Sequence, residues 1–94
     1  MKPKKTAKKE VIDGYDRINR ALLGAKWQER DDLNVMYISA ARQNRDSSRV
    51  LQDDAGRIAM LMSSGAMLVI FETLDDYLLQ LSLIIRNRDR TPPD

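Results

Sequence analysis

Residues 65–85 read GAMLVIFETLDDYLLQLSLII, and this stretch decides the fold that the sequence predicts. Six large apolar side chains recur in it at alternating steps of four and three residues, which is the spacing of a coiled-coil seam. The seam consists of Met67, Phe71, Leu74, Leu78, Leu81 and Ile85. Other apolar residues fall between them, so a helix over this stretch must be buried on several sides. We therefore predict a long C-terminal helix covered by other helices or by a second chain, and we expect the six seam residues to form the self-association or partner-binding site.

The first part of this stretch also has a second interpretation. AMLVIF, residues 66–71, is short, partly β-branched and preceded by Gly65, as is typical of a buried strand. Periodicity alone does not separate helix from strand over so few residues. Helix is the prediction for 66–71, and strand is the alternative.

The N-terminal part of the chain shows helical spacing as well. An apolar stripe runs through residues 10–23, and Gly24 stands where a glycine commonly ends a helix. The stripe consists of Val11, Tyr15, Ile18 and Leu22. We expect a helix over 10–23, followed by a connection that holds Trp27, which we interpret as a packing anchor.

Two more helices are predicted between residues 31 and 62. The first has an aspartate as its cap and carries the apolar stripe Leu33, Met36, Tyr37, Ala40 and Ala41. The second contains Val50, Leu51, Ala55, Ile58, Ala59 and Met62. Residues 42–49 between them lack apolar side chains, so they form either a turn or the polar middle of one longer helix.

Three pairs of adjacent aspartates raise the question of a catalytic or metal site. Adjacent residues on a helix point about 100° apart, so one pair cannot aim both carboxylates at a single ligand. Each pair also has a local role, as a helix cap, as partners for Arg57, or on a polar helix face. We interpret them as helix surface. The pairs are Asp31-Asp32, Asp53-Asp54 and Asp75-Asp76.

The composition argues against catalysis. The 94 residues include no Cys and no His, which removes thiolate nucleophiles, imidazole bases and the usual ligands of zinc and other transition metals. No glycine-rich phosphate loop or hydrolase motif is present. We predict a non-enzyme with no catalytic residue, no metal site and no cofactor.

Charge is distributed unevenly along the chain. Five of the 16 Lys and Arg residues lie within the first nine positions, so the remainder is mildly acidic although the whole chain carries a net +2. We expect a flexible basic tail over 1–9, a single helical domain over 10–88 and a flexible tail over 89–94. If 42–49 is helical, three arginines share one face and could contact nucleic acid together with the tail. The candidate contacts are Lys4, Lys5, Lys8, Lys9, Arg42, Arg45 and Arg49.

No membrane span is expected. The most apolar stretch, residues 65–85, contains Glu72, Asp75 and Asp76, and an aspartate at the centre of a membrane helix costs about 2.5–3.5 kcal/mol to insert. The absence of Cys is compatible with a reducing compartment, and we predict a cytoplasmic location.

The sequence therefore predicts an all-α protein, either a helical hairpin or a small bundle, with a coiled-coil-like C-terminal helix and a core completed by oligomerisation. A domain of this size buries only about 60–65% of its unfolded surface, so a second chain would help it. We expect a homo-oligomeric protein–protein interaction module that acts as an adaptor, chaperone or regulator. The alternative is a small dimeric regulator that binds nucleic acid.

Overall fold

The computed structural model describes residues 8–44, 47–62 and 67–90 and shows an α+β protein. The prediction of an all-α bundle is wrong, because five strands form one antiparallel sheet that three helices cover. In chain order the elements are β1 (Lys9–Asp13), α1 (Tyr15–Leu23), β2 (Trp27–Glu29), α2 (Asp31–Ala41), β3 (Ser48–Asp53), β4 (Ile58–Met62), β5 (Met67–Phe71) and α3 (Leu74–Arg90).

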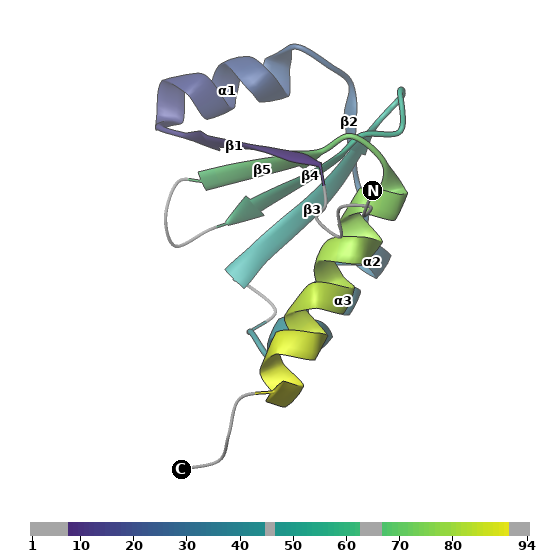
Figure 1. The fold of residues 1–94 in the computed structure, drawn as a ribbon. Coiled ribbons are helices and arrows are strands. Elements are labelled where there is room, and N and C mark those ends of the chain that lie inside the picture. Colours follow the sequence, from purple (N-terminus) through teal and green to yellow (C-terminus); the bar gives the residue numbers. More distant parts are fainter. Residues whose placement is uncertain (1–7, 45–46, 63–66, 91–94) are drawn as a thin grey trace, which may run out of the picture.

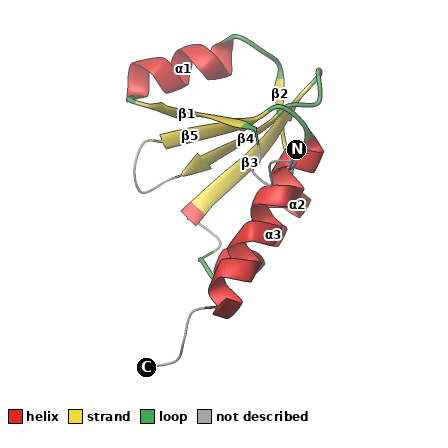
Figure 2. Cartoon of the chain, in the orientation of Figure 1, coloured by secondary structure: helices red, strands yellow, loops and turns green. Residues whose placement is uncertain are grey.

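The sheet lies between two helical layers (Figures 1 and 2). Its strand order is β1-β5-β4-β3-β2, and every neighbouring pair is antiparallel. Residues of α1 pack with one set of alternating strand residues, and residues of α2 and α3 pack with the other set. We call these two surfaces the α1 face and the helix-pair face.

The C-terminal stretch is a strand followed by a helix. Residues Met67–Phe71 form β5, an interior strand of the sheet between β1 and β4, and α3 begins only at Leu74. Helices cover the sheet on both faces, so the four consecutive residues 68–71 are all buried. A strand buried on both faces has no polar alternation, and an apolar run of this kind resembles a helix. The continuous helix and its coiled-coil seam are wrong, and the strand alternative for 66–71 is confirmed at Met67–Phe71.

Residues 48–62, interpreted as a helix from Val50 onward, form the β3–β4 hairpin instead. Gly56 has φ 92° in the connecting turn, a backbone conformation that favours glycine. A carboxylate oxygen of Asp53 accepts hydrogen bonds from the backbone N–H groups of Ala55 (3.1 Å) and Arg57 (2.7 Å). These bonds fix a tight turn between the strands, and tertiary burial of both strands overrides their helical spacing.

The predicted N-terminal helix begins too early. Residues Lys9–Asp13 form β1, and Gly14, at φ 90°, separates this strand from α1. From Tyr15 onward the prediction is confirmed, and the helix ends at Gly24 as expected. Tyr15 is nevertheless exposed, while Ile18 is buried against the sheet.

The second predicted helix is confirmed as α2. Asp31 and Asp32 lie in its first turn, although Arg30 occupies the cap position and no side chain caps the helix by a hydrogen bond. The helix ends at Arg42, which has a left-handed conformation with φ 56°. Residues 42–49 are therefore not a continuous helix, since α2 has ended and β3 begins at Ser48.

Candidate functional site

Most residues of the predicted seam pack in the core of the single chain. Met67 and Phe71 lie on β5, and the remaining four residues lie on α3. Phe71 and Leu81 are buried, while Leu74 and Leu78 pack against the core of the helix-pair face. Met67 and Ile85 reach the surface, each about 38% exposed. A partner-binding role for these six residues stays a prediction, and in this fold only the two exposed ones are open to a partner.

The arginine row does not form. Arg42 lies at the end of α2, whereas Arg49 lies on β3, where its guanidinium pairs with the Glu29 carboxylate at 3.0 Å. The guanidinium also lowers the pKa of Glu29 through this hydrogen bond. The row depended on a helix through 42–49, and without that helix the two described members, Arg42 and Arg49, lie on different elements. Arg45, Lys4 and Lys5 lie outside the described residues.

The described lysines of the predicted tail contact α3. The backbone N–H of Lys8 donates to the Asp76 carboxylate at 3.1 Å, and Nζ of Lys9 donates to Oε1 of Gln80 at 3.0 Å. The Lys8 bond and a bond from the Thr73 hydroxyl lower the pKa of Asp76. Asp75 and Asp76, the third aspartate pair, lie in the first turn of α3, so this pair marks the start of a helix.

Asp53 has the most structured environment of the six paired aspartates. Its side chain is 1% exposed and pairs with Nε of Arg57 at 2.7 Å, so the predicted ion pair exists on a hairpin rather than a helix. Burial alone would raise the pKa of Asp53, but the side-chain and backbone hydrogen bonds from Arg57 and Ala55 hold it below its usual value. The Arg57 guanidinium also lies 5.2 Å from the centre of the Trp27 ring. This cluster joins β2 to the hairpin and satisfies its own charges, so it has the character of a structural anchor.

The described residues offer neither a metal-binding cluster nor a membrane-spanning helix. Within 8–44, 47–62 and 67–90, no group of three or more acidic side chains is placed to hold a metal ion. None of the helices formed by those residues combines the length and apolarity needed to cross a membrane.

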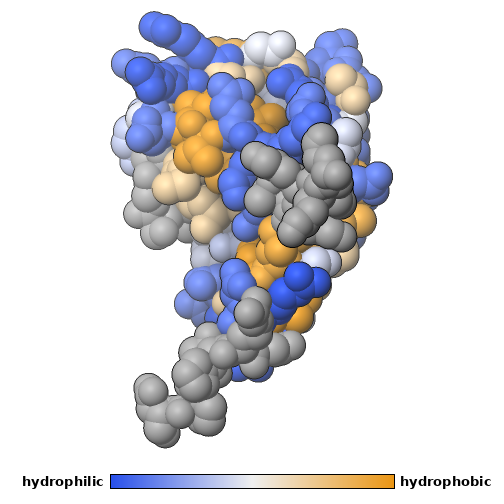
Figure 3. All heavy atoms as spheres, in the orientation of Figure 1, coloured by the Kyte–Doolittle hydropathy of each residue, from blue (hydrophilic) through white to orange (hydrophobic). Residues whose placement is uncertain are grey.

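An apolar groove between α2 and α3 is the clearest candidate binding surface. Its volume is about 430 Å³. We call it the helix groove; it is lined by Val35, Met36, Ser39, Ala40, Leu81, Ile85 and Arg88. Val35 and Met36 are each 44% exposed, so the rim of the groove is apolar and open, while buried Leu81 contributes to its floor. Figure 3 shows apolar surface extending along α3.

One end of the helix groove is held by a charged side chain. Nη1 of Arg88 donates to the backbone oxygen of Ala40 at 2.9 Å and lies 3.5 Å from that of Ser39. These oxygens belong to the last turn of α2, where carbonyl groups lack partners within the helix and a cation is favourable. The bond fixes the separation of the two helices and leaves the apolar rim exposed.

The second candidate surface is the outer edge of β1. All five residues of β1 are exposed except Ile12, which is half-buried, and in the described part of the chain β1 pairs with β5 alone. Glu10, Val11 and Ile12 line a groove of about 340 Å³ together with Arg17 and Arg20 of α1. Sequence reasoning missed this edge, because an exposed polar strand has no apolar alternation to reveal it.

Comparisons with known proteins add no assignment. No family model, curated protein or solved structure matches the chain. The function must therefore be argued from the surfaces themselves.

Proposed function

We propose that the protein is a non-enzymatic interaction module whose helix groove binds an apolar segment of another protein. The observation that carries this proposal is the apolar rim formed by Val35, Met36 and Ile85 around buried Leu81. The roles considered from the sequence, as adaptor, chaperone or regulator, all require such a surface.

The groove has the features of a site for an apolar side chain. A fully buried leucine-sized anchor is worth about 1.5–3 kcal/mol, so one or two anchors from a partner would supply useful affinity. Methionine has three rotatable bonds and a polarisable sulfur, and Met36 can therefore adapt its shape to a bound segment.

The composition supports a binding rather than a catalytic role. The chain has neither Cys nor His, and Asp53, the most buried carboxylate among the described residues, is engaged by Arg57 within a turn. The nucleic-acid alternative receives no comparable support, since Arg42 and Arg49 lie on different elements and Arg49 pairs with Glu29.

Substitutions on the rim test the proposal. Met36→Glu and Ile85→Glu place a charge where an apolar partner would bind, and both positions are open enough for the variants to fold. Leu23→Glu is the matched control, because Leu23 is an exposed apolar residue on α1, away from the groove.

The wild type and the control are used to capture proteins from the organism of origin, and any captured protein is then purified and titrated by calorimetry. We expect wild type and Leu23→Glu to bind it equally, and each rim variant to weaken binding by about tenfold or more. A partner that binds the rim variants as tightly as the wild type would refute the helix groove as the binding site.

A further inference from the structure

The free edge of β1 carries a pattern of charges that matches a second copy of itself. Lys9, Val11 and Asp13 oppose Phe71, Val69 and Met67 of β5. Phe71 and Val69 belong to the core of the helix-pair face. On β1, Glu10 and Ile12 alternate with Lys9, Val11 and Asp13 and oppose residues of the α1 face. Val11 is 55% exposed, although it lies beside the core residue Val69.

Backbone geometry restricts how two copies of β1 could pair. In an antiparallel ladder, alternate residues direct their N–H and C=O groups to one neighbouring strand, and the residues between them direct theirs to the other. The outward-directed groups of β1 therefore belong either to Lys9, Val11 and Asp13 or to Glu10 and Ile12. Two residues directly opposite each other across the dimer must therefore belong to the same set. In a twofold-symmetric pairing, this condition places one residue of β1 directly opposite its own copy in the second chain.

Any of the five residues of β1 could lie on the twofold axis. Registers centred on Lys9 or Asp13 oppose two like charges and overlap only at one end of the strand, which leaves three, and two of these are poor. A register centred on Glu10 brings two carboxylates directly opposite each other, which is destabilising. A register centred on Ile12 places Gly14 opposite Glu10, and the φ of 90° at Gly14 interrupts the strand. A register centred on Val11 uses all five residues of β1.

The register centred on Val11 is also electrostatically complementary. It places Lys9 opposite Asp13 of the second copy and, by symmetry, Asp13 opposite Lys9 of the second copy, on both sides of a central pair of valines. Direct cross-strand pairs have Cβ atoms about 4.5–5.5 Å apart, close enough for an ion pair.

In the single chain, Asp13 pairs with Arg17 at a distance of 3.8 Å, with both side chains largely exposed. Lys9 donates to Gln80, and this bond is exposed as well. Exposed contacts of this kind are weak and can be exchanged.

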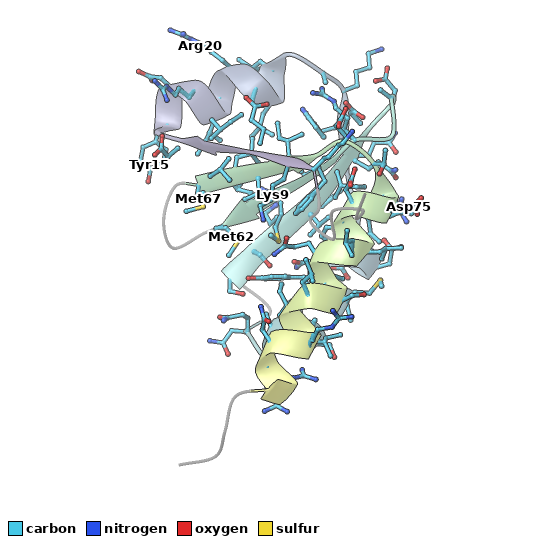
Figure 4. All side chains as sticks on the ribbon, viewed as in Figure 1. Lys9, Tyr15, Arg20, Met62, Met67 and Asp75 are labelled. Atoms are coloured by element: carbon cyan, nitrogen blue, oxygen red, sulfur yellow. The ribbon has the colours of Figure 1, made fainter. Side chains whose placement is uncertain are left out.

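The α1 face supports the same register. There Glu10 of the second copy lies opposite Ile12, next to the groove lined by Arg17 and Arg20. Its carboxylate would enter a basic environment on that side. Figure 4 shows Tyr15 and Met67 at one end of this edge and Lys9 further along it. Tyr15 and Met67 are both exposed and stand beside the expected contact.

We infer that two copies of the chain form a homodimer through antiparallel pairing of β1 with β1, in the register that places Val11 on the twofold axis and Lys9 against Asp13. The two sheets then join into one continuous sheet of ten strands, with both copies of α1 on one side and all four remaining helices on the other. Five-residue strands make a small interface, so we expect a weak dimer with a Kd of about 10–100 µM. This interface lies away from the helix groove and does not depend on the proposed function.

Charge exchange in the full-length chain tests the register. Lys9→Asp alone creates two aspartate–aspartate pairs, and Asp13→Lys alone creates two lysine–lysine pairs, so each variant should dimerise about tenfold more weakly than the wild type. An equimolar mixture of the two variants restores opposite charges in both pairs and should form a heterodimer close to wild-type affinity. The double variant Lys9→Asp/Asp13→Lys restores them within one chain and should recover the homodimer, although it also lacks the Lys9–Gln80 bond.

Sedimentation equilibrium at several protein concentrations gives the measurement, with thermal melts to confirm that each variant is folded. Asp54→Lys is the control, because it changes the net charge as Asp13→Lys does but lies exposed in the β3–β4 turn. We expect it to dimerise like the wild type. A wild-type chain that stays monomeric at about 500 µM would overturn the inference, whatever the helix groove binds. A mixture no tighter than its separate components, or a control as weak as Asp13→Lys, would overturn it equally.

Discussion

The two faces of the sheet are built differently. The core on the helix-pair face contains ten buried residues, five on the strands and five on α2 and α3. Among them are Phe71 of β5 and Tyr77 of α3, whose rings meet edge to face at 5.5 Å. The core on the α1 face contains five buried residues, four on the strands and Ile18 on the nine-residue helix α1. Burial of apolar area is the main source of stability, so the helix-pair face should contribute most of it. The α1 face should be the first to open.

Polar anchors differ between the faces in the same way. On the helix-pair face they are neutral: the Tyr77 hydroxyl donates to the Leu33 carbonyl at 2.6 Å, and the Ser48 hydroxyl donates to Oδ1 of Asn34 at 2.6 Å. On the α1 face the anchor is ionic, since Asp53 is opposite Trp27 and pairs with Arg57. The two faces should therefore respond differently both to truncation and to pH.

The largest effect is expected for Phe71→Ala, which removes a fully buried ring from the helix-pair face. The change leaves a cavity between β5 and α3 and removes the edge contact with Tyr77. We expect the free energy of unfolding to fall by about 3–5 kcal/mol, measured by chemical denaturation. A loss below about 1 kcal/mol would mean that this face does not dominate the core.

Ile18→Ala makes the equivalent change on the α1 face. A cost of about 2–3 kcal/mol is expected, because the thin layer above Ile18 can partly collapse into the space. Trp27 reports the loosening, since its Nε1 donates to the Ala21 carbonyl of α1 at 3.3 Å. Its fluorescence should shift to longer wavelength in Ile18→Ala and stay unchanged in folded Phe71→Ala. The opposite pattern would show that the two faces are not independent.

This difference in coverage also explains which elements the sequence predicted. Helix α2 is covered on one side only, so Leu33, Tyr37 and Ala40 of its predicted stripe are buried, as expected. Met36 was assigned to the same stripe, but it is 44% exposed, and its assignment to the core was wrong. The part of α3 from Leu74 onward was recognised as a helix from the spacing of its apolar residues, although Ile85 on that seam is 38% exposed. In both cases the hydrophobic period matches the element that forms.

The interior strands were not predicted, because they are covered on both faces and their apolar residues do not alternate with polar ones. In β4, Ile58, Ala59 and Met60 are buried consecutively because helices cover both faces of the sheet, and such a run satisfies helical spacing by chance. The two edge strands were not predicted for other reasons. β1 is almost fully exposed, with only Ile12 half-buried, and β2 is only three residues long. The helix groove was also missed, although Ile85 had been singled out, since it depends on how α2 packs against α3.

A pH-dependent effect of intermediate size is expected for Asp53→Asn. The folded-state pKa of Asp53 lies below its ordinary value, so its contribution to stability is present above that value and is lost as pH falls through the folded pKa. Near neutral pH, Asp53→Asn should cost about 1.5–3 kcal/mol, because it breaks a buried ion pair but keeps an acceptor for the turn. The difference from wild type should shrink below about pH 4.

Thermal unfolding across this pH range measures the effect. Glu29→Gln provides the control, because its ion pair with Arg49 is more than half exposed and should contribute little. A cost for Asp53→Asn that stays constant from neutral to acid pH would show that the carboxylate acts only as a turn acceptor, and the α1 face would then have no ionic anchor.

The smallest effect is expected for Tyr77→Phe on the helix-pair face. The change keeps the ring and its contact with Phe71 but removes the hydroxyl that donates to the Leu33 carbonyl. That carbonyl lies in α2, where the helix can supply another donor, so we expect a cost of only about 0.5–1.5 kcal/mol.

Burial raises the pKa of Tyr77, so the hydroxyl stays neutral from acid to neutral pH and the cost should not change there. Its contribution should disappear only as pH rises above the ordinary tyrosine value of about 10. Tyr15→Phe, at an exposed position, is the matched control and should leave unfolding unchanged. If Tyr77→Phe lost its effect in acid, as we expect for Asp53→Asn, the contrast between a neutral and an ionic face would be wrong.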